Sequence, residues 1–223
     1  MKSGKERIEE MIKRGYDNPE ITNRKYNLLI GLTLLYGFIV NIGMCILFTD
    51  AIAKINYIVL LIGYFVLTIA GVIIVNVSNK PIISFLGYNL VVIPIGATLT
   101  VILDSYQYIT VINAFITTAA VTAVMIIISS IYPNAFSKMG RGLFISLLLS
   151  IIVEIVLMLF GVYLTVFDWI VAIIFTLYIG YDWSIAQKAP KTIDNAVDNA
   201  CGLYLDIINL FLRILRIFGR RSN

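Results

Sequence analysis

The sequence contains no histidine, and this absence excludes several kinds of catalytic site. Without an imidazole, the chain cannot form a Ser-His or Cys-His catalytic pair, a histidine-ligated zinc site or a haem with an axial histidine. No nucleophile motif of another kind is present either. We therefore expect that the protein is not an enzyme and that it needs no cofactor.

Cysteine and charge are also scarce. Cys45 and Cys201 both lie in apolar segments, where buried thiols are far more common than disulfides or metal sites. Only 13% of the residues are charged and 60% are hydrophobic, which is outside the range of a soluble globular domain. The net charge of +4 comes without the aromatic stacking surface of a nucleic-acid-binding protein. We expect a lipid bilayer around the chain and no nucleic-acid partner.

Long apolar segments fill most of the sequence. Each of the first six is about 20 residues long, which is enough to cross the hydrocarbon region as a helix, and none alternates like a β-barrel strand. The seventh is less apolar and carries a polar stripe at helical spacing, so we expect it in the centre of the bundle rather than flat on the membrane surface. The sequence predicts an all-α polytopic membrane bundle of six to seven transmembrane helices with the last helix central. The expected spans are residues 27–48, 57–77, 82–103, 108–131, 143–163, 167–186 and 196–218.

The predicted organisation is a cytosolic N-terminal arm (1–26), a single transmembrane bundle (27–218) and a short basic tail (219–223). Residues 6–14 have the pattern of a short amphipathic helix, which we expect to be solvated rather than to bind a partner. Seven basic residues lie in the arm and five in the connections after the second, fourth and sixth segments, against only Lys54 in the other connections. The positive-inside rule therefore predicts a cytosolic N-terminus.

Two points of topology stay open. If the seventh segment crosses the membrane fully, the arginines at its end would lie on the outer side of the membrane. If it turns back within the membrane, they would lie on the cytosolic side. The first 26 residues lack the apolar stretch of a signal peptide, and the loops are compact. We expect a bacterial plasma membrane, with the endoplasmic reticulum membrane as the alternative.

Two aspartates, Asp182 and Asp206, lie inside apolar segments. They are 24 residues apart on consecutive segments joined by a turn with Pro190, so an antiparallel hairpin brings them level. Inserting a charged side chain near the bilayer core costs at least ~2.5–3.5 kcal/mol of free energy. Such a residue therefore persists where it is ion-paired, hydrated or needed for function. We expect the two carboxyl groups to titrate as a unit. When protonated, they form a hydrogen bond that holds the two helices together; when deprotonated, they repel each other and attract a cation. The pair predicts a proton- or cation-responsive gate, unless each aspartate separately caps a backbone or faces headgroups.

Other polar residues could support this site. Asn209 and Arg213 share the polar stripe of the seventh segment with Asp206. Glu154, in the middle of the fifth segment, could line a cation path or be protonated and bonded to a polar neighbour. Three further aspartates fall at the outer ends of spans, where we expect them to be solvated: Asp50, Asp104 and Asp168.

The C-terminal third resembles a known family. Residues 203–219 (LYLDIINLFLRILRIFG) resemble the closing signature of the Bax inhibitor-1 family, and residues 178–184 (YIGYDWS) resemble its tyrosine-aspartate on helix six. Residues 114–142 resemble its fourth helix and the loop that follows. The resemblance, to a bacterial-type member, implies a seven-helix bundle and a pH-sensitive calcium leak channel. It also implies that Asp182 and Asp206 are the gate, the pH sensor and a transient calcium site, with calcium and protons as partners.

The chain departs from the family pattern in two places. In bacterial relatives an arginine on helix two latches the aspartates, but the second segment here has no charge, and Lys80 and Arg213 are the nearest basic candidates. Trp183 replaces the residue type usual after the helix-six aspartate. From these two departures we expect the gate to close differently or at a shifted pH. A non-conducting membrane adaptor that binds other membrane proteins is the alternative function, and a proton-coupled solute transporter is a third.

Overall fold

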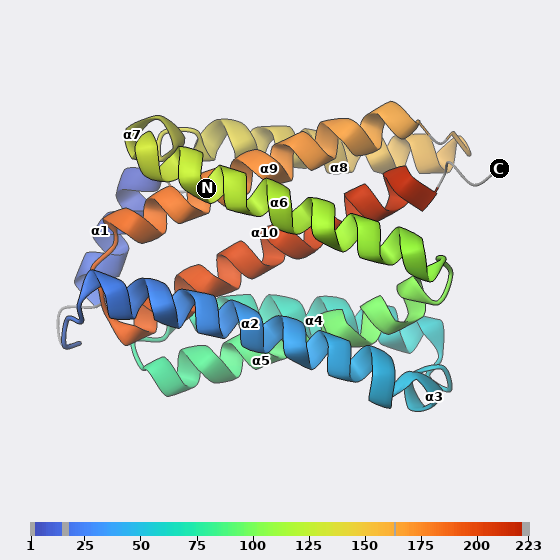
Figure 1. Cartoon of the computed structure of the whole chain (residues 1–223), viewed down its shortest axis with the longest axis horizontal. Helices are drawn as coiled ribbons and strands as arrows, with labels where there is room; N and C mark the ends of the chain where they lie inside the picture. The colour runs from blue at the N-terminus through green and yellow to red at the C-terminus, as the bar shows by residue number, and fades with distance from the viewer. Residues whose placement is uncertain (1–2, 15–17, 163, 220–223) are drawn as a thin grey trace. The chain divides into compact units, whose positions relative to one another are not determined.

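The structure is a computed structural model that describes residues 3–14, 18–162 and 164–219 (Figure 1). Every regular element in these ranges is a helix. Within the same ranges, six helices are long and apolar enough to cross a membrane, which confirms the predicted all-α polytopic membrane bundle. They are α2 (Asn23–Leu47), α4 (Tyr57–Val77), α5 (Pro81–Leu103), α6 (Tyr108–Ile131), α8 (Gly140–Leu159) and α9 (Thr165–Lys188).

Four more helices complete the described chain. The predicted amphipathic helix of the arm forms as α1 (Gly4–Arg14), and α3 (Thr49–Ile52) and α7 (Pro133–Phe136) are short connecting helices. The seventh segment forms α10 (Ile193–Gly219), a continuous helix of 27 residues. At 1.5 Å per residue it is about 40 Å long, enough to cross the hydrocarbon core. Because α10 is continuous, the alternative that this segment turns back is wrong; its central position stays a prediction.

The helices begin at residues that suit a helix N-terminus. Thr22 caps α2 and Asn56 caps α4, each by accepting a hydrogen bond from a backbone amide of the first turn. Pro81 opens α5 and Pro133 opens α7. Proline fits the first turn because its missing N–H would have no helical partner there. These residues mark the starts of the helices, which lie within a few residues of the predicted starts.

The chain forms two compact units. Unit 1 consists of Met1–Glu10, Gln107–Lys188 and Leu205–Asn223, and unit 2 of Met11–Tyr106 and Ala189–Tyr204. In unit 1, α9 is contacted by α6, α7 and α8. In unit 2, α5 is contacted by α2, α3 and α4. The helices α9 and α5 are accordingly the most buried of the six spans. The predicted bounds of the arm, bundle and tail stay predictions, and residues 220–223 of the tail lie outside the described residues.

Two glycines bring α4 and α5 of unit 2 into direct backbone contact. A Cβ atom on Gly71 would lie 2.5 Å from the carbonyl oxygen of Gly87 and 2.8 Å from the side chain of Val91. A Cβ on Gly87 would meet Ile74 and Val75 at 2.9 and 3.0 Å. Small residues at a helix interface allow this approach, and close packing is a main source of stability between helices in lipid.

This contact predicts the effect of adding a single methyl group. We expect Gly71→Ala to lower the free energy of unfolding by roughly 1–3 kcal/mol, because α4 and α5 must separate to admit the methyl group. Gly63→Ala, in the same helix, is the control, because its Cβ would meet nothing within 4 Å. Chemical unfolding in mixed micelles measures both. Equal effects of the two substitutions would contradict the role of Gly71.

Candidate gate site

Asp182 lies near the end of α9 and is paired with an arginine from the N-terminal helix. The residue is 6% exposed. Nη1 of Arg7, on α1, donates to Oδ1 of Asp182 at 2.6 Å. Both residues belong to unit 1. A hydrogen bond between two charged groups at this distance is among the stronger ones in proteins. The arm expected to be solvated therefore supplies the charge that compensates a buried carboxylate, and that expectation is wrong for Arg7.

The environment of Arg7 keeps it charged. Burial by itself disfavours the guanidinium ion, but the Asp182 carboxylate, with Tyr181 beside it, outweighs burial and raises the pKa of Arg7 above its ordinary value. Since the ordinary pKa of arginine is already above 12, Arg7 stays positive at every physiological pH. Any response of this site to pH must therefore come from the carboxyl groups.

Asp206 is the second buried carboxyl group of the site. It is 7% exposed on the part of α10 that belongs to unit 1. The charged groups that act on it electrostatically are Asp182 and Arg7. Its Oδ2 atom is buried and has no hydrogen-bond partner among the described residues. Two carboxyl groups thus share one arginine, and one oxygen of the pair is left for a proton, a water molecule or a cation.

The α9 side of the site is fixed by close packing. A Cβ on Gly180 would lie 2.6 Å from the ring of Phe136, and a Cβ on Gly140 would lie 2.6 Å from the ring of Tyr181. Nε1 of Trp183, the residue that departs from the family pattern, donates to Oγ of Ser130 on α6 at 2.7 Å. These contacts hold the turn of α9 that carries Asp182 against α6, α7 and α8.

A second ionic cluster in unit 1 contains Glu154, Asp168, Arg213 and Arg216. Arg213 donates to both carboxylate oxygens of Glu154, at 2.8 and 2.7 Å, and to Asp168 at 3.2 Å. Arg216 donates to Glu154 at 3.2 Å and forms an ion pair with Asp168 at 3.4 Å. Two carboxylates balance two guanidinium ions, so the cluster is neutral as a whole. Along α9, Asp168 and Asp182 are about 21 Å apart.

The cluster changes the interpretation of two residues. Asp168 is 3% exposed and paired with both arginines, so the expectation that it is solvated is wrong, whereas Asp50 and Asp104 are exposed as predicted. Glu154 makes ion pairs with Arg213 and Arg216 instead of a hydrogen bond to a neutral neighbour. Its partners are therefore the arginines of α10.

Within the described residues, no hydrogen bond or ion pair joins the aspartate pair to Asn209 or Arg213, two of the predicted supporting residues, or to the latch candidate Lys80. Nδ2 of Asn209 donates to the carbonyl of Leu205 in its own helix at 2.7 Å. Arg213 is engaged in the second cluster, and Lys80 is exposed at the start of α5. Arg7, which was not among the candidates, is the basic residue that pairs with Asp182. The sequence carried no signal for this pairing, because Arg7 and Asp182 are 175 residues apart.

The site offers few metal ligands. No group of three or more acidic or cysteine side chains that could hold a metal ion gathers within residues 3–14, 18–162 and 164–219. Calcium binds six to eight oxygen atoms, so a site with two carboxylates must complete its shell with water or backbone oxygens. That Asp182 and Asp206 form a transient calcium site remains a prediction.

The fold and the site define a polytopic helical membrane protein with two buried aspartates, one of which is paired with an arginine. Its family follows from the sequence comparison: the chain belongs to the family described as Inhibitor of apoptosis-promoting Bax1, the Bax inhibitor-1 family, whose sequence model matches residues 19–223. The resemblance noted in the C-terminal third is therefore confirmed.

Curated relatives come from bacteria. The chain is 34% identical over 136 residues to an uncharacterized membrane protein of Streptococcus pyogenes serotype M3, a match that covers 57% of this chain and 59% of that protein. It is 35% identical over 88 residues to an uncharacterized protein of Helicobacter pylori, covering 39% of this chain and 37% of that protein. The match thus spans only part of each relative, and the names establish a membrane protein without an activity.

The second ionic cluster predicts strong coupling between its members. We expect Glu154→Gln and Arg213→Gln each to destabilise the protein, because each leaves an uncompensated partner. The double substitution should lose less stability than the sum of the single ones, by about 0.5–3 kcal/mol. Chemical unfolding in mixed micelles of the wild type and three variants measures this coupling. Additive losses would show that the pair does not act as a unit.

Proposed function

We propose that the protein is a pH-sensitive calcium leak channel gated by protonation of Asp182 and Asp206, with Arg7 as the latch. The observation that carries the proposal is the 2.6 Å ion pair between Arg7 and Asp182, beside a second buried carboxyl with an unpartnered oxygen. Ionisable residues within membrane segments are rare and mostly functional. Membership of the Bax inhibitor-1 family supports the same function.

A charge count explains how protons would close the gate. Arg7 compensates one of the two carboxylates, so a single proton on the pair makes the buried site neutral. When this proton leaves, the site carries one unit of uncompensated negative charge, which is unfavourable in a medium of low polarity. The carboxylates then repel each other and attract a cation. Acidification therefore favours the closed state, and a higher pH favours the state that admits calcium.

The distribution of basic residues supports a location for the gate. The arm and the connections after α4, α6 and α9 carry the excess of Lys and Arg, which the positive-inside rule assigns to the cytosol. Arg7 lies in the arm, and Asp182 lies near the end of α9 that leads into one of these connections. We place the sensor at the cytosolic side of a bacterial plasma membrane, with the endoplasmic reticulum membrane as the alternative.

Calcium flux into liposomes tests the gate. With purified protein and pH from about 6 to 8, we expect flux to fall on acidification. Asp206→Asn and Asp182→Asn should each remove most of this pH dependence, because an amide cannot exchange a proton in this range. Asp50→Asn is the matched control, since Asp50 is exposed in α3. If both Asp182→Asn and Asp206→Asn keep the pH dependence of the wild type, the pair is not the sensor.

Arg7 has its own signature in the same assay. We expect Arg7→Gln to move the pH of half-maximal flux downwards, because the site then needs a second proton to become neutral and the closed state loses the ion pair between α1 and α9. Arg7→Lys keeps a positive charge and should stay closer to the wild type. An unchanged midpoint in Arg7→Gln would contradict the latch while leaving the aspartate pair as the sensor.

A membrane adaptor, the alternative function, would use the basic residues of the arm or the arginines of the C-terminal end for contacts with its partners. In the described residues, Arg7, Arg213 and Arg216 are instead engaged in ion pairs inside unit 1. These contacts favour the channel. Well-folded protein that shows no calcium flux at any pH would favour the adaptor.

A further inference from the structure

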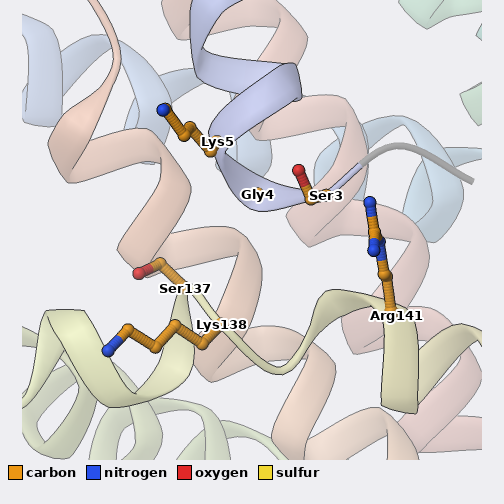
Figure 2. A pocket seen from close by; sticks show the side chains of 6 residues that line it. All are labelled: Ser3, Gly4, Lys5, Ser137, Lys138 and Arg141. Atoms are coloured by element: carbon orange, nitrogen blue, oxygen red, sulfur yellow. The ribbon is translucent and has the colours of Figure 1, made fainter.

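A pocket lined mainly by serine and basic residues lies in unit 1 where the start of α1 meets the connection between α7 and α8. Its volume is about 360 Å³. Figure 2 shows the first residues of α1 on one side and the connecting segment with the start of α8 on the other. The lining residues are Ser3, Gly4, Lys5, Ser137, Lys138 and Arg141. The pocket is separate from the carboxyl groups of the gate, although α1 contributes to both.

The two sides of the pocket are held together by direct contacts. Gly4 lies so close to the carbonyl oxygen of Ser137 that a Cβ atom would collide with it. The Glu6 carboxylate accepts a hydrogen bond from the backbone amide of Ser3 at 2.7 Å and pairs with Arg141 at 3.3 Å. The Ser3 amide and then the Arg141 charge lower the pKa of Glu6, which therefore stays ionised at neutral pH.

Positive charge exceeds negative charge around the pocket. Nζ of Lys188 donates to Oγ of Ser137 at 2.7 Å and lies near enough to Lys138 for the two ammonium groups to repel each other. Together with Lys5 and Arg141 this makes four cations. The neighbouring carboxylates are Glu6, paired with Arg141, and Glu9, which lies 3.8 Å from the well-exposed Lys5. An anion in the pocket would relieve this repulsion.

We propose that this pocket binds a phosphate group, supplied by an anionic phospholipid headgroup or by free inorganic phosphate. The lysines and Arg141 compensate its charge, the hydroxyl groups of Ser3 and Ser137 offer hydrogen bonds, and the positive end of the α1 dipole faces it. Under the proposed topology the pocket lies at the cytosolic end of the bundle, where anionic headgroups attract basic residues.

Binding at this pocket would act on the gate, and this step rests on the proposed function. Lys5 precedes Arg7 by two residues on α1, and Lys138 and Arg141 belong to the opposite side. A phosphate that bridges the two sides holds α1 in place, and with it the ion pair of Arg7 with Asp182. The bound phosphate therefore stabilises the closed state.

Thermal unfolding in a neutral detergent tests the binding without any flux measurement. We expect inorganic phosphate or dihexanoyl phosphatidylglycerol to raise the unfolding midpoint, relative to chloride of equal ionic strength and to dihexanoyl phosphatidylcholine. Lys138→Gln should raise the half-saturating concentration at least tenfold, and Lys5→Gln should weaken binding as well. The exposed Lys54→Gln, in unit 2, is the matched control.

The two probes distinguish the sources of the phosphate. A shift with the anionic lipid alone assigns the site to a headgroup, and a shift with both probes shows that free phosphate suffices. No shift with either probe, or the same shift in Lys138→Gln as in the wild type, would overturn the site.

Flux in vesicles tests the regulatory step separately. In phosphatidylglycerol vesicles we expect the gate to close at a higher pH than in phosphatidylcholine vesicles, and Lys138→Gln should remove this difference. Binding without an effect on flux would overturn the regulatory step and leave the site. Absence of flux in all vesicles would overturn the proposed channel, while the unfolding measurement would still decide on the site.

Discussion

A carboxylate buried in a membrane bundle persists only where another charge or a proton compensates it. In this protein Arg7 supplies that charge to Asp182 from a helix that lies outside the six spans, and the rest of the candidate gate depends on this ion pair. It ties α1 to α9, and it fixes the number of protons that make the site neutral. Under the proposed function, Asp206, on which the same two charges act, is the group whose proton decides between a neutral and a negative site.

The two ionic clusters of unit 1 differ in their charge balance, and this difference assigns them different roles. Arg213 and Arg216 meet as many carboxylates as there are arginines, so that cluster is compensated without protons and serves to hold α8, α9 and α10 together. The site at Arg7 contains two carboxyl groups, Asp182 and Asp206, but only one arginine. Under the proposed function, only the site at Arg7 changes its net charge when it gains or loses a proton, which is the property that a pH sensor requires.

Hydropathy alone predicted the six spans to within a few residues, because a membrane helix requires about 20 apolar residues whatever surrounds it. The aspartate pair could be recognised for the same reason, since charge inside such a segment is exceptional. Arg7 could not be placed, because its partner is 175 residues away and only tertiary packing brings the arm onto α9. Asp168 was missed because a carboxylate near a span end is usually solvated, and its burial depends on Arg213 and Arg216 of α10.

Under the proposed function, one proton on the pair of Asp182 and Asp206 separates the closed from the conducting state. Infrared difference spectroscopy of the protein in lipid, titrated over the pH range of the flux change, observes that proton through the carbonyl stretch of a protonated carboxyl group. The account predicts a band that disappears with rising pH in parallel with the rise in calcium flux, and that is missing in Asp206→Asn. A flux that changes with pH while no carboxyl band of this pair changes would contradict it.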